Sequence, residues 1–571
     1  MFKKFEKLVL AGIQSASQRK FILIGTLLAF IISVLMIAPS EIVKVKMLPG
    51  KNNDTFNIYV KLPTGSSIEQ TKQVTDCVSS YVIQEKELRD TEVFLGMGSP
   101  LDFAGLIKGS QFKNSENVAE IVLNITKKHE REEPSYMMVQ RMRPVIQGSC
   151  EKLYPGTDIS FVEPPAGPPT LAAIVMEVYG NSAKGIRKVA DRVENVFRHT
   201  KGLVDIDTME DTIYSTFEVK VDSTKIARSD LNVKQLNNIL YLAFKGMDIA
   251  VKNSAKYNEQ IPIFLSLSKS SKRFTKKDLT AVQAKLASLK LMNTKGMMIP
   301  VTGLVTIIPK KSDPKIMSKD LKHMTNVMAE TDMVSQVYPL LKARASILKT
   351  FTNEYKIEKT GLFNLRLTDK KTGAVYDLIW DGEMKVTMDT FRDLGGAFIA
   401  ALILIFLLMV IYYKSYTLSG IILLGSFLSI IGVIVGHWIM DIFTTDTFFL
   451  TATSLIGFIA LIGISSRNSL LLIDFTKSLM ADKGMHKAEA IAYASATRAK
   501  PIMLTAVAII LASTLLAADP VFGGLGVALI FGTIAAVVAS LIVVPVLLYM
   551  SDLETHFHFH EKKAVSVEDP V

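Results

Sequence analysis

The stretch that decides the fold is TATSLIGFIALIGISSRNSLLLIDFTK, residues 451–477. It is apolar and longer than the roughly 20 residues that a helix needs to cross a bilayer. It nevertheless carries Arg467 in its interior and Asp474 near one end. A charged side chain at that depth costs at least about 2.5 kcal/mol on insertion scales, so it needs a partner or a wet cavity. The stretch therefore predicts a membrane helix that does more than anchor the chain.

The two charges are predicted to lie on one face of this helix. Arg467 and Asp474 are seven residues apart, which corresponds to two helical turns. Ala460 and Gly463 continue the same face, so a neighbouring helix could approach closely there. The simpler alternative is an arginine that snorkels to the lipid headgroups. Because the apolar run 470–473 still follows Arg467, a position inside the membrane is favoured.

Composition indicates a membrane protein with a large aqueous part. The chain has 571 residues, of which 49% are hydrophobic and 21% charged, and its mean hydropathy is +0.30. The net charge is +11, and much of the basic excess flanks apolar stretches. Phospholipid therefore explains the charge better than nucleic acid does, and no zinc-finger or RNA-binding signature argues otherwise.

Five other apolar stretches are long enough to be membrane helices. Residues 1–20 are basic, and the apolar run 21–39 that follows exceeds a signal-peptide core and lacks a small-x-small cleavage site. We therefore expect an uncleaved helix there. The remaining stretches follow the long polar part of the chain and fall at 394–413, 417–440, 501–518 and 522–550.

The basic residues predict the orientation of these spans. Lys414 marks one turn, and the linker 477–500 holds further lysines and an arginine, whereas the other turns in the region 394–550 hold neither. Because positive loops stay in the cytoplasm, the pattern predicts six spans. Residues 1–20 and the tail 551–571 are then cytoplasmic, and residues 40–393 lie on the far side of the membrane.

The far-side region reads as two strand-and-helix units. Residues 54–163 follow the order β-α-β-β-α-β of ferredoxin-like folds, with a capping box Ser66-x-x-Glu69 opening the first helix. A second unit occupies 172–214 and 314–375, split by an insertion at 215–313. The predicted fold class is an α-helical membrane bundle joined to an α+β domain of two ferredoxin-like units.

The chain has two cysteines, Cys77 and Cys150, and both fall in the far-side region. A disulfide is possible in such a compartment. Two isolated cysteines in helical patterns are more often unpaired. The sequence therefore favours free thiols while leaving the bond open.

Four segments together resemble the C-terminal half of a resistance–nodulation–division (RND) efflux transporter. They are FIALIGISSRNSLLLIDF (458–475), RAKPIMLTA (498–506), VFLGMGSPLDFAGL (93–106) and EPPAGPPTLAAIVMEVYG (163–180). The resemblance implies that the two ferredoxin-like units are porter subdomains in the periplasm and that the insertion is a docking subdomain. It also implies a multi-pass protein of the cell inner membrane, driven by the proton motive force with no cofactor.

The resemblance covers one half of a usual family member. In the family, a pair of aspartates in the N-terminal half carries the proton, and no Asp–Asp pair occurs in any span of this chain. We therefore expect the N-terminal half on a separate chain. The family further implies a trimer of paired halves, a periplasmic adaptor and an outer-membrane channel, with no nucleic acid.

The resemblance and the local chemistry assign a proton relay to four residues. Arg467, where the family commonly has lysine, cannot titrate and serves as a fixed countercharge. Thr505 would hydrogen-bond the relay, unless its hydroxyl is bonded to its own i−4 carbonyl. Asp474, near the cytoplasmic edge, is favoured as an anchor over a proton carrier. Arg498 lies at the cytoplasmic mouth and is either part of the relay or only a positive-inside residue.

The resemblance also implies a site for hydrophobic cargo. Aromatic and methionine side chains offer adaptable apolar contacts, and the expected substrate-binding residues are Phe94, Met97, Phe103, Leu106 and Phe112. Phe94 has the alternative of a core position in a strand. Phe103 and Phe112 are stronger candidates because they lie in a Gly- and Ser-containing loop.

Two other function classes stay open. A protein-export accessory of the SecD/SecF type has a related architecture, and a non-pumping subunit or membrane-anchored enzyme is also conceivable. No nucleophile elbow, HExxH motif or P-loop occurs, so an enzyme is not expected. The tail histidines, His556, His558 and His560, are interpreted as a chance run in a polar tail and not as a metal site.

Overall fold

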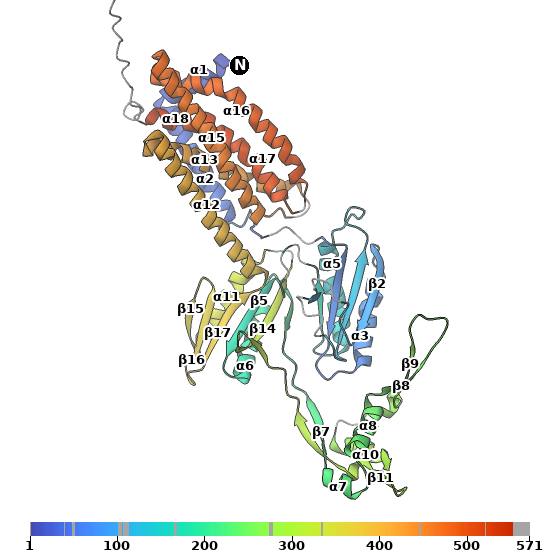
Figure 1. The fold of residues 1–571 in the computed structure, drawn as a ribbon. Helices are drawn as coiled ribbons and strands as arrows, with labels where there is room; N and C mark the ends of the chain where they lie inside the picture. The colour runs from blue at the N-terminus through green and yellow to red at the C-terminus, as the bar shows by residue number, and fades with distance from the viewer. Residues whose placement is uncertain are drawn as a thin grey trace, which may run out of the picture. The chain divides into compact units, whose positions relative to one another are not determined.

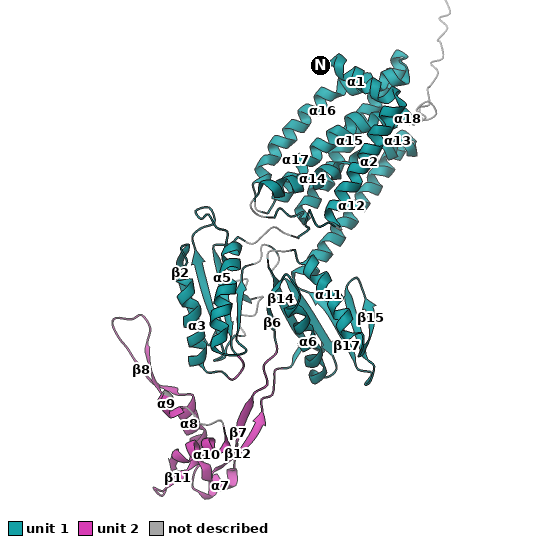
Figure 2. Cartoon of the chain, turned by 180° about the vertical axis from the view of Figure 1, so that it is seen from behind, with its two compact units in different colours: residues 1–62, 66–209, 316–571 teal, residues 63–65, 210–315 magenta. Residues whose placement is uncertain are grey.

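The computed structural model describes residues 2–38, 40–47, 52–100, 105–106, 113–164, 167, 170–272, 278–332, 335–444, 447–519 and 521–551. The chain divides into two compact units, which Figure 2 distinguishes by colour. Unit 1 comprises residues 1–62, 66–209 and 316–571, and unit 2 comprises residues 63–65 and 210–315.

Within the described residues, six helical segments of unit 1 are long and apolar enough to cross a membrane. Figure 1 shows them side by side in one bundle. They are α2 (Ala16–Ile37), α12 (Glu383–Tyr413), α13 (Tyr416–Phe427) with α14 (Ser429–Phe443), α15 (Ala452–Lys483), α16 (Lys487–Ala517), and α17 (Gly523–Val538) with α18 (Val544–Met550). A π-helical turn at Ala539–Val543 joins α17 to α18, and a short helix α1 (Phe2–Gln14) precedes α2.

Two of these helices differ from the sequence-based boundaries. The expected start at residue 501 is wrong for α16, which begins at Lys487 and contains Pro501 inside the helix. Hydropathy misses the first turns because they are polar in sequence, although Ile491 and Ser495 are buried. The helix α12 runs without a break from Glu383 to Tyr413, so it begins before the expected start of the span at residue 394.

The first ferredoxin-like unit is a four-stranded antiparallel sheet in the order β2-β3-β1-β4. Its elements are β1 (Thr55–Lys61), α3 (Ile68–Val82), β2 (Leu88–Leu95), β3 (Val118–Ile125), α5 (Ser135–Cys150) and β4 (Asp158–Val162). The element order is the predicted one. In β1, buried and half-buried residues alternate, because the inward residues pack on α3 and α5 in a shared core.

Two local predictions in this unit need correction. The capping box is formed by Ser67 and Gln70, one residue later than the expected Ser66 and Glu69. Both pairs fit the S-x-x-E/Q pattern, so sequence cannot choose between them. The preference for free thiols is also wrong, because Cys77 of α3 and Cys150 at the end of α5 form a disulfide with a Cα–Cα distance of 5.8 Å.

The second ferredoxin-like unit is a seven-stranded sheet with the path β13-β14-β5-β17-β16-β15, and β6 pairs with β14. Its elements are β5 (Ile174–Gly180), α6 (Ala183–Arg198), β6 (Leu203–Thr208), β13 (Met317–Lys319), β14 (Lys322–Thr331), α11 (Val337–Phe351), β15 (Tyr355–Thr360), β16 (Asn364–Asp369) and β17 (Val375–Asp381). At its C-terminal end, the three consecutive strands β15, β16 and β17 pair antiparallel.

Unit 2 is built around a strand pair, β7 (Ser215–Val221) with β12 (Val305–Lys311). Its other elements are α7 (Ser223–Arg228), α8 (Val233–Phe244), β8 (Met247–Lys252), β9 (Ile261–Leu265), α9 (Lys269–Lys272), α10 (Leu279–Ser288), β10 (Lys290–Met292) and β11 (Met298–Pro300). Between β11 and β12 the extended chain is interrupted by a 3₁₀ turn at Val301–Gly303. The break follows Pro300, which has no N–H to continue a ladder.

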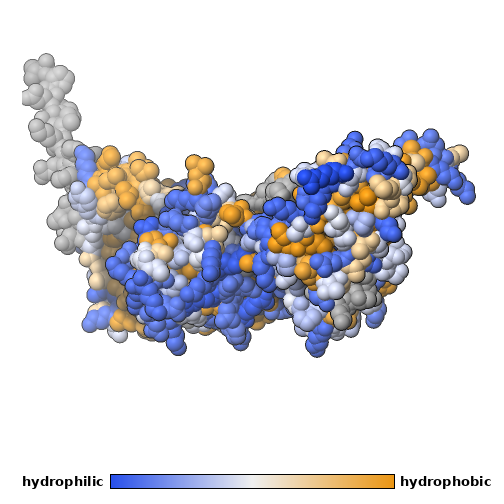
Figure 3. Space-filling model, turned by 90° about the horizontal axis from the view of Figure 1, so that it is seen from below, coloured by the Kyte–Doolittle hydropathy of each residue, from blue (hydrophilic) through white to orange (hydrophobic). Residues whose placement is uncertain are grey.

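The surface seen in Figure 3 is mainly hydrophilic, with separate hydrophobic patches. In contrast, α2 and α12 expose many large apolar side chains, among them Ile24, Leu28, Leu404 and Ile411. Exposed apolar surface on long helices is what a lipid environment stabilises.

Candidate functional site

Arg467 lies at the middle of α15, 15 residues after Ala452 and 16 before Lys483. At 1.5 Å per residue, it is about 22 Å from either end of the helix. The helix begins at a capping box between Thr451 and Ser454 and ends at Gly484 in a left-handed conformation. The two termini are therefore well defined, and the arginine is not at a frayed end.

The side chain of Arg467 lies on the face of α15 that the rest of the bundle leaves open. Ile456 is 47% exposed, Leu471 is 38% exposed, and Ala460 and Arg467 between them are also exposed. A Cβ added to Gly463 would meet no atom within 4 Å. Arg467 has no ion-pair or hydrogen-bond partner among the described residues. The arginine at the middle of α15 thus faces outward from the part of the bundle that the structure describes.

The opposite face of α15 is buried and rich in hydroxyl groups. Ser465, Ser466 and Ser469 are all at most 5% exposed. The hydroxyls of Ser466 and Ser426 of α13 are 3.0 Å apart. A Cβ on Gly425 would meet the Ser469 hydroxyl at 3.4 Å, which shows how closely α13 and α15 approach. Small polar side chains here permit tight helix packing inside the bundle.

Asp474 is held by the C-terminal end of α12 and forms no ion pair with Arg467, which is also among the described residues. The hydroxyl of Tyr413 donates to Asp474 Oδ1 at 2.7 Å, and the hydroxyl of Tyr412 donates to Oδ2 at 3.3 Å. Tyr413 also lies 3.3 Å from the carbonyl of Leu470. These bonds fasten α12 to α15, and they support the anchoring role over that of a proton carrier.

The other two relay residues make contacts of their own. Thr505 Oγ1 donates to the carbonyl of Pro501 at 2.9 Å, which is the i−4 bond that the sequence offered as an alternative. The Arg498 guanidinium lies 5.0 Å from the centre of the Phe475 ring, and its Nε is buried without a hydrogen-bond partner among the described residues. Among the described residues, neither Thr505 nor Arg498 forms a hydrogen bond or an ion pair with Arg467.

The proposed cargo residues are only partly described. Phe94 lies in β2 opposite Glu120 and is half-buried, so it is not a core residue of the sheet. Met97 is 54% exposed and Leu106 is 47% exposed. Phe103 and Phe112 lie outside the described residues. Met97 and Leu106 thus expose apolar surface to solvent, as a site for hydrophobic cargo requires.

A buried ion-pair network between the two ferredoxin-like units was not predicted from the sequence. Asp205 of β6 accepts hydrogen bonds from Arg143 of α5 at 3.1 Å, from Gln147 at 3.1 Å and from the backbone N–H of Phe161 at 3.2 Å. Its side chain is 1% exposed, and burial raises the pKa of the Asp205 carboxyl while Arg143 opposes that rise. Nothing in the local pattern LVDID marks one aspartate as buried.

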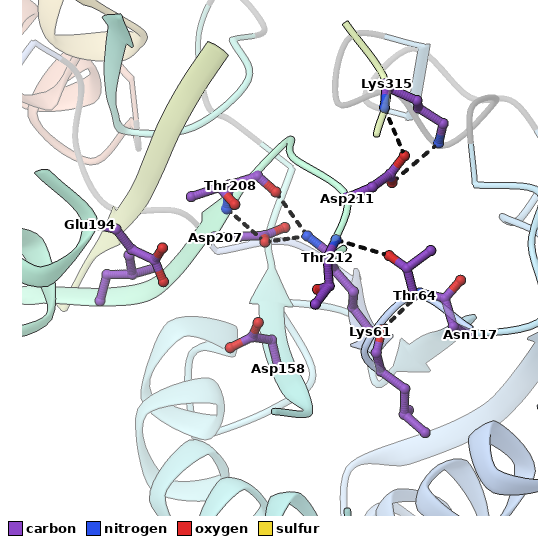
Figure 4. Close-up of polar contacts among 12 residues, drawn as sticks. Lys61, Thr64, Asn117, Asp158, Glu194, Asp207, Thr208, Asp211, Thr212 and Lys315 are labelled. Carbon is purple, nitrogen blue, oxygen red and sulfur yellow. Dashed lines mark hydrogen bonds and ion pairs between the residues drawn. The ribbon is translucent and has the colours of Figure 1, made fainter. Parts of the chain in front are cut away.

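A second contact between these units lies nearby. Lys61 Nζ at the end of β1 donates to Asp207 Oδ1 at 2.6 Å and to the carbonyl of Thr208 at 2.8 Å (Figure 4). Burial also raises the pKa of the neighbouring Asp158 carboxyl. The Asp205 network thus joins α5 and β4 to β6, and the Lys61 contacts join β1 to β6.

Comparison with known proteins shows similarity to one protein family along almost the whole chain. Residues 4–552 match the AcrB/AcrD/AcrF family. Swarming motility protein SwrC of Bacillus subtilis is 23% identical over 554 residues, covering 94% of this chain and 46% of that protein. Multidrug export protein AcrF of Escherichia coli is 20% identical over 520 residues, covering 87% of this chain and 45% of that protein.

The fold is also that of a solved structure. The crystal structure of a heavy metal efflux pump (crystal form II) superimposes with a TM-score of 0.71 at 18% identity, covering 97% of this chain and 51% of that chain. This chain therefore spans about half the length of the relatives that it matches.

Proposed function

The chain belongs to the AcrB/AcrD/AcrF family, whose members are RND transporters and not enzymes, and we propose that it drives efflux of hydrophobic and amphiphilic compounds by proton antiport. In this proposal the chain is the C-terminal half of a pump, and a separate polypeptide supplies the N-terminal half. The SecD/SecF-type alternative is less favoured, because the family match runs through almost the entire chain.

The observation that carries the proposal is the open face around Arg467. A guanidinium at mid-span that met only lipid would cost at least about 2.5 kcal/mol. Ala460 and Gly463 leave room beside it for a second helix. We infer that this helix brings the acidic pair. The acids would pair with Arg467 when ionised and release it when protonated, so proton uptake would change how the two halves pack.

The remaining partners follow from the same proposal. The assembly would be a trimer of paired halves in the cell inner membrane, with residues 40–393 in the periplasm, a periplasmic adaptor and an outer-membrane channel. The name of the multidrug export relative supports a drug-like cargo. The exposed Met97 and Leu106 are the described side chains that would contact it.

Isolation of the native complex tests the proposal. The complex is captured from membranes through a tag on this chain, and its subunits are identified by mass spectrometry. A second six-span polypeptide in equal amount, carrying an acidic pair in one span, is the expected result. In proteoliposomes with an imposed pH gradient, the pair should transport and this chain alone should not. Proton-coupled transport by this chain alone would refute the proposal.

A further inference from the structure

A line of buried polar side chains lies at the N-terminal end of α15, where α14 and α17 pack against it (Figure 2). Its members are His437 of α14 and the residues Thr451, Thr453 and Ser454, none of them more than 7% exposed. Ser454 Oγ lies 2.8 Å from His437 Nε2 and 3.0 Å from Thr451 Oγ1. Thr453 Oγ1 lies 2.8 Å from Thr451 Oγ1 and 3.3 Å from the carbonyl oxygen of Val521. We call the three hydroxyl groups the hydroxyl chain, and it joins a buried imidazole to the segment before α17 by four contacts.

The number of hydrogen atoms limits how this chain can be arranged. His437 Nδ1 lies 2.7 Å from the carbonyl oxygen of Val433, which can only accept, so Nδ1 carries a hydrogen and Nε2 of a neutral ring can only accept. The three hydroxyl groups then supply three hydrogens for four contacts. With a neutral ring, the hydroxyls all point towards His437, and the contact to the carbonyl of Val521 has no hydrogen. With a protonated ring, Nε2–H supplies the fourth hydrogen, the hydroxyls point the other way, and all four contacts are hydrogen bonds.

Both arrangements fit the backbone around the chain. The N–H of Thr451 donates to Ser454 Oγ at 3.1 Å, and the N–H of Ser454 donates to Thr451 Oγ1 at 3.4 Å. In either arrangement, each of these two oxygens accepts two hydrogen bonds and donates one, which is the full capacity of a hydroxyl group. The hydroxyl chain can therefore reverse its direction while the capping box of α15 stays intact.

We propose that His437 is a proton-binding site and that the hydroxyl chain carries the proton to it from water at the Val521 end. A proton that bonds to Thr453 Oγ1 sends the hydrogen of that hydroxyl to Thr451, the hydrogen of Thr451 moves to Ser454, and the hydrogen of Ser454 moves to Nε2. Each oxygen gains one O–H bond and loses one, and the ring gains one N–H bond and one positive charge. Histidine suits this task because its charge changes near physiological pH. Val521 at the outer end is 37% exposed, whereas Ser454 and His437 are fully buried.

The groups around His437 show how its charge would be accommodated. The ring of Phe448 lies 5.5 Å from the imidazole, within the distance at which an aromatic ring attracts a cation. Asp441 lies one helical turn further along α14, and its Oδ1 accepts a hydrogen bond from the N–H of Phe448 at 2.7 Å. Of the helices packed against α14, α13 and α17 contain no Asp, Glu, Lys, Arg or His. The other charged residues around the site are Arg19 and Lys20 of α2, Arg467 and the residues after it in α15, Lys44 and Lys46 beside Leu450, and Asp519 beside Val521.

This site is distinct from the one at Arg467. The arginine follows Ser454 by 13 residues, which is about 20 Å along the helix, and it cannot titrate. In the predicted topology, the Val521 end of the chain is the periplasmic end of the bundle, the side from which a proton antiporter takes its protons. This use of the site rests on the proposed function, whereas the binding of a proton by His437 does not.

Solid-state NMR of the full chain in liposomes, with ¹⁵N-labelled histidine, tests the site. The chain has eight histidines, so the His437 signal is assigned as the one lost in His437→Gln and the one kept when the other seven are changed to Gln. Those of the seven that the structure describes are exposed. Between about pH 8 and pH 4, Nε2 is expected to change from an acceptor nitrogen to an N–H, while Nδ1 stays an N–H. A His437 ring that remains neutral throughout this range, or that carries its hydrogen on Nε2 at the start, would overturn the proposal.

A variant of the hydroxyl chain tests the path. Thr453→Val keeps the shape of the side chain and removes its hydroxyl, so the protonated chain loses its last hydrogen bond and Thr451 loses its acceptor. Proton binding at His437 is expected to weaken by about tenfold. Thr476→Val is the matched control, because Thr476 is a buried residue of the same helix whose hydroxyl donates to the carbonyl of Leu472 at 2.9 Å; it should titrate as the wild type does. Wild-type titration of His437 in Thr453→Val would overturn the assignment of the path. Because transport is not measured, either result leaves the efflux proposal untouched.

Discussion

Arg467 places a permanent charge at the middle of a membrane helix, on the side that its own bundle does not cover. A guanidinium does not titrate in proteins, so its effect on a proton relay is purely that of a fixed countercharge. The sequence predicts a position inside the span, because apolar residues continue on both sides of it. The exposure of the Arg467 side chain could not be predicted from the sequence, because it depends on where the other helices pack.

The first prediction concerns this charge. Arg467→Ala should abolish proton-coupled transport by the reconstituted complex, because loss of the cation would raise the pKa values of the facing acids by about 1–3 units and keep them protonated. Arg467→Lys should retain part of the activity, since the charge remains while the planar fork is lost. Lys500→Ala, at an exposed position of α16, is the control and should transport normally. Transport by Arg467→Ala at the wild-type rate would make the relay assignment wrong.

The second prediction concerns the Arg143–Asp205 ion pair. Arg143→Ala leaves a buried carboxylate without its cation, which typically costs about 3–5 kcal/mol. The N–H of Phe161 donates to the same carboxylate, so hydrogen exchange at Phe161 should accelerate strongly in Arg143→Ala. Arg141→Ala removes an exposed arginine of the same helix and is expected to leave that exchange unchanged. Equal exchange in both variants would contradict the role given to Arg143.

The third prediction is a pH dependence. The folded state raises the pKa of Asp205 above its ordinary value, so the folded chain holds this proton more tightly than the unfolded chain. The corresponding stability is fully present below the ordinary pKa and decreases as the pH rises through the raised folded pKa. Thermal unfolding measured across this window should show a smaller decrease for Asp205→Asn than for the wild type. If the unfolding temperatures of the wild type and of Asp205→Asn decrease equally across this window, Asp205 is not the source of the pH dependence.

At the scale of elements, the order of strands and helices was largely predictable from the sequence. The side-chain contacts that join one element to another were not. The alternating pattern of β1 and the apolar stripe of α6 follow from burial on one face. The bond between Tyr413 and Asp474 joins residues 61 positions apart, and no local pattern identifies such a pair. The polar first half of α16 was missed because hydropathy measures composition, whereas helix formation there depends on packing.

The fourth prediction concerns the disulfide that fastens α3 to α5. The bond closes a loop with a sequence separation of 73 residues, for which chain-entropy arguments give a stabilisation of about 4 kcal/mol. Reductant should lower the unfolding temperature of the wild type. The double variant Cys77→Ser/Cys150→Ser should unfold at this lower temperature whether or not reductant is present. Two titratable thiols in the native, unreduced protein would show that the bond does not form.

At the scale of the whole molecule, the fold is shared with an efflux pump of known structure, and the order of segments predicted this relationship. Four short motifs from both the membrane helices and the polar region occur in the family's order, and such agreement is far more specific than any one of them. The orientation in the membrane is a separate matter, because it rests only on the distribution of lysine and arginine.

The fifth prediction tests that orientation by cysteine labelling in intact cells. Ser270→Cys in unit 2 should react with a membrane-impermeant maleimide added from outside. Ser478→Cys, exposed near the C-terminal end of α15, should react only after the inner membrane is permeabilised. The disulfide keeps both native cysteines from reacting. Labelling of Ser478→Cys from outside would invert the predicted topology.

The unbroken length of α12 has a mechanical consequence. Its first N–H groups, at Glu383 and Met384, donate to the carbonyls of Ala172 and Ala173 beside β5, and its last residue, Tyr413, is bonded to Asp474. With 31 residues, the helix is about 46 Å long. A stiff rod of that length pivoting by about 5° swings its far tip by about 4 Å. α12 can thus serve as a lever arm that turns a slight rotation at the sheet into a displacement of several ångströms, which its bond to Asp474 passes on to α15.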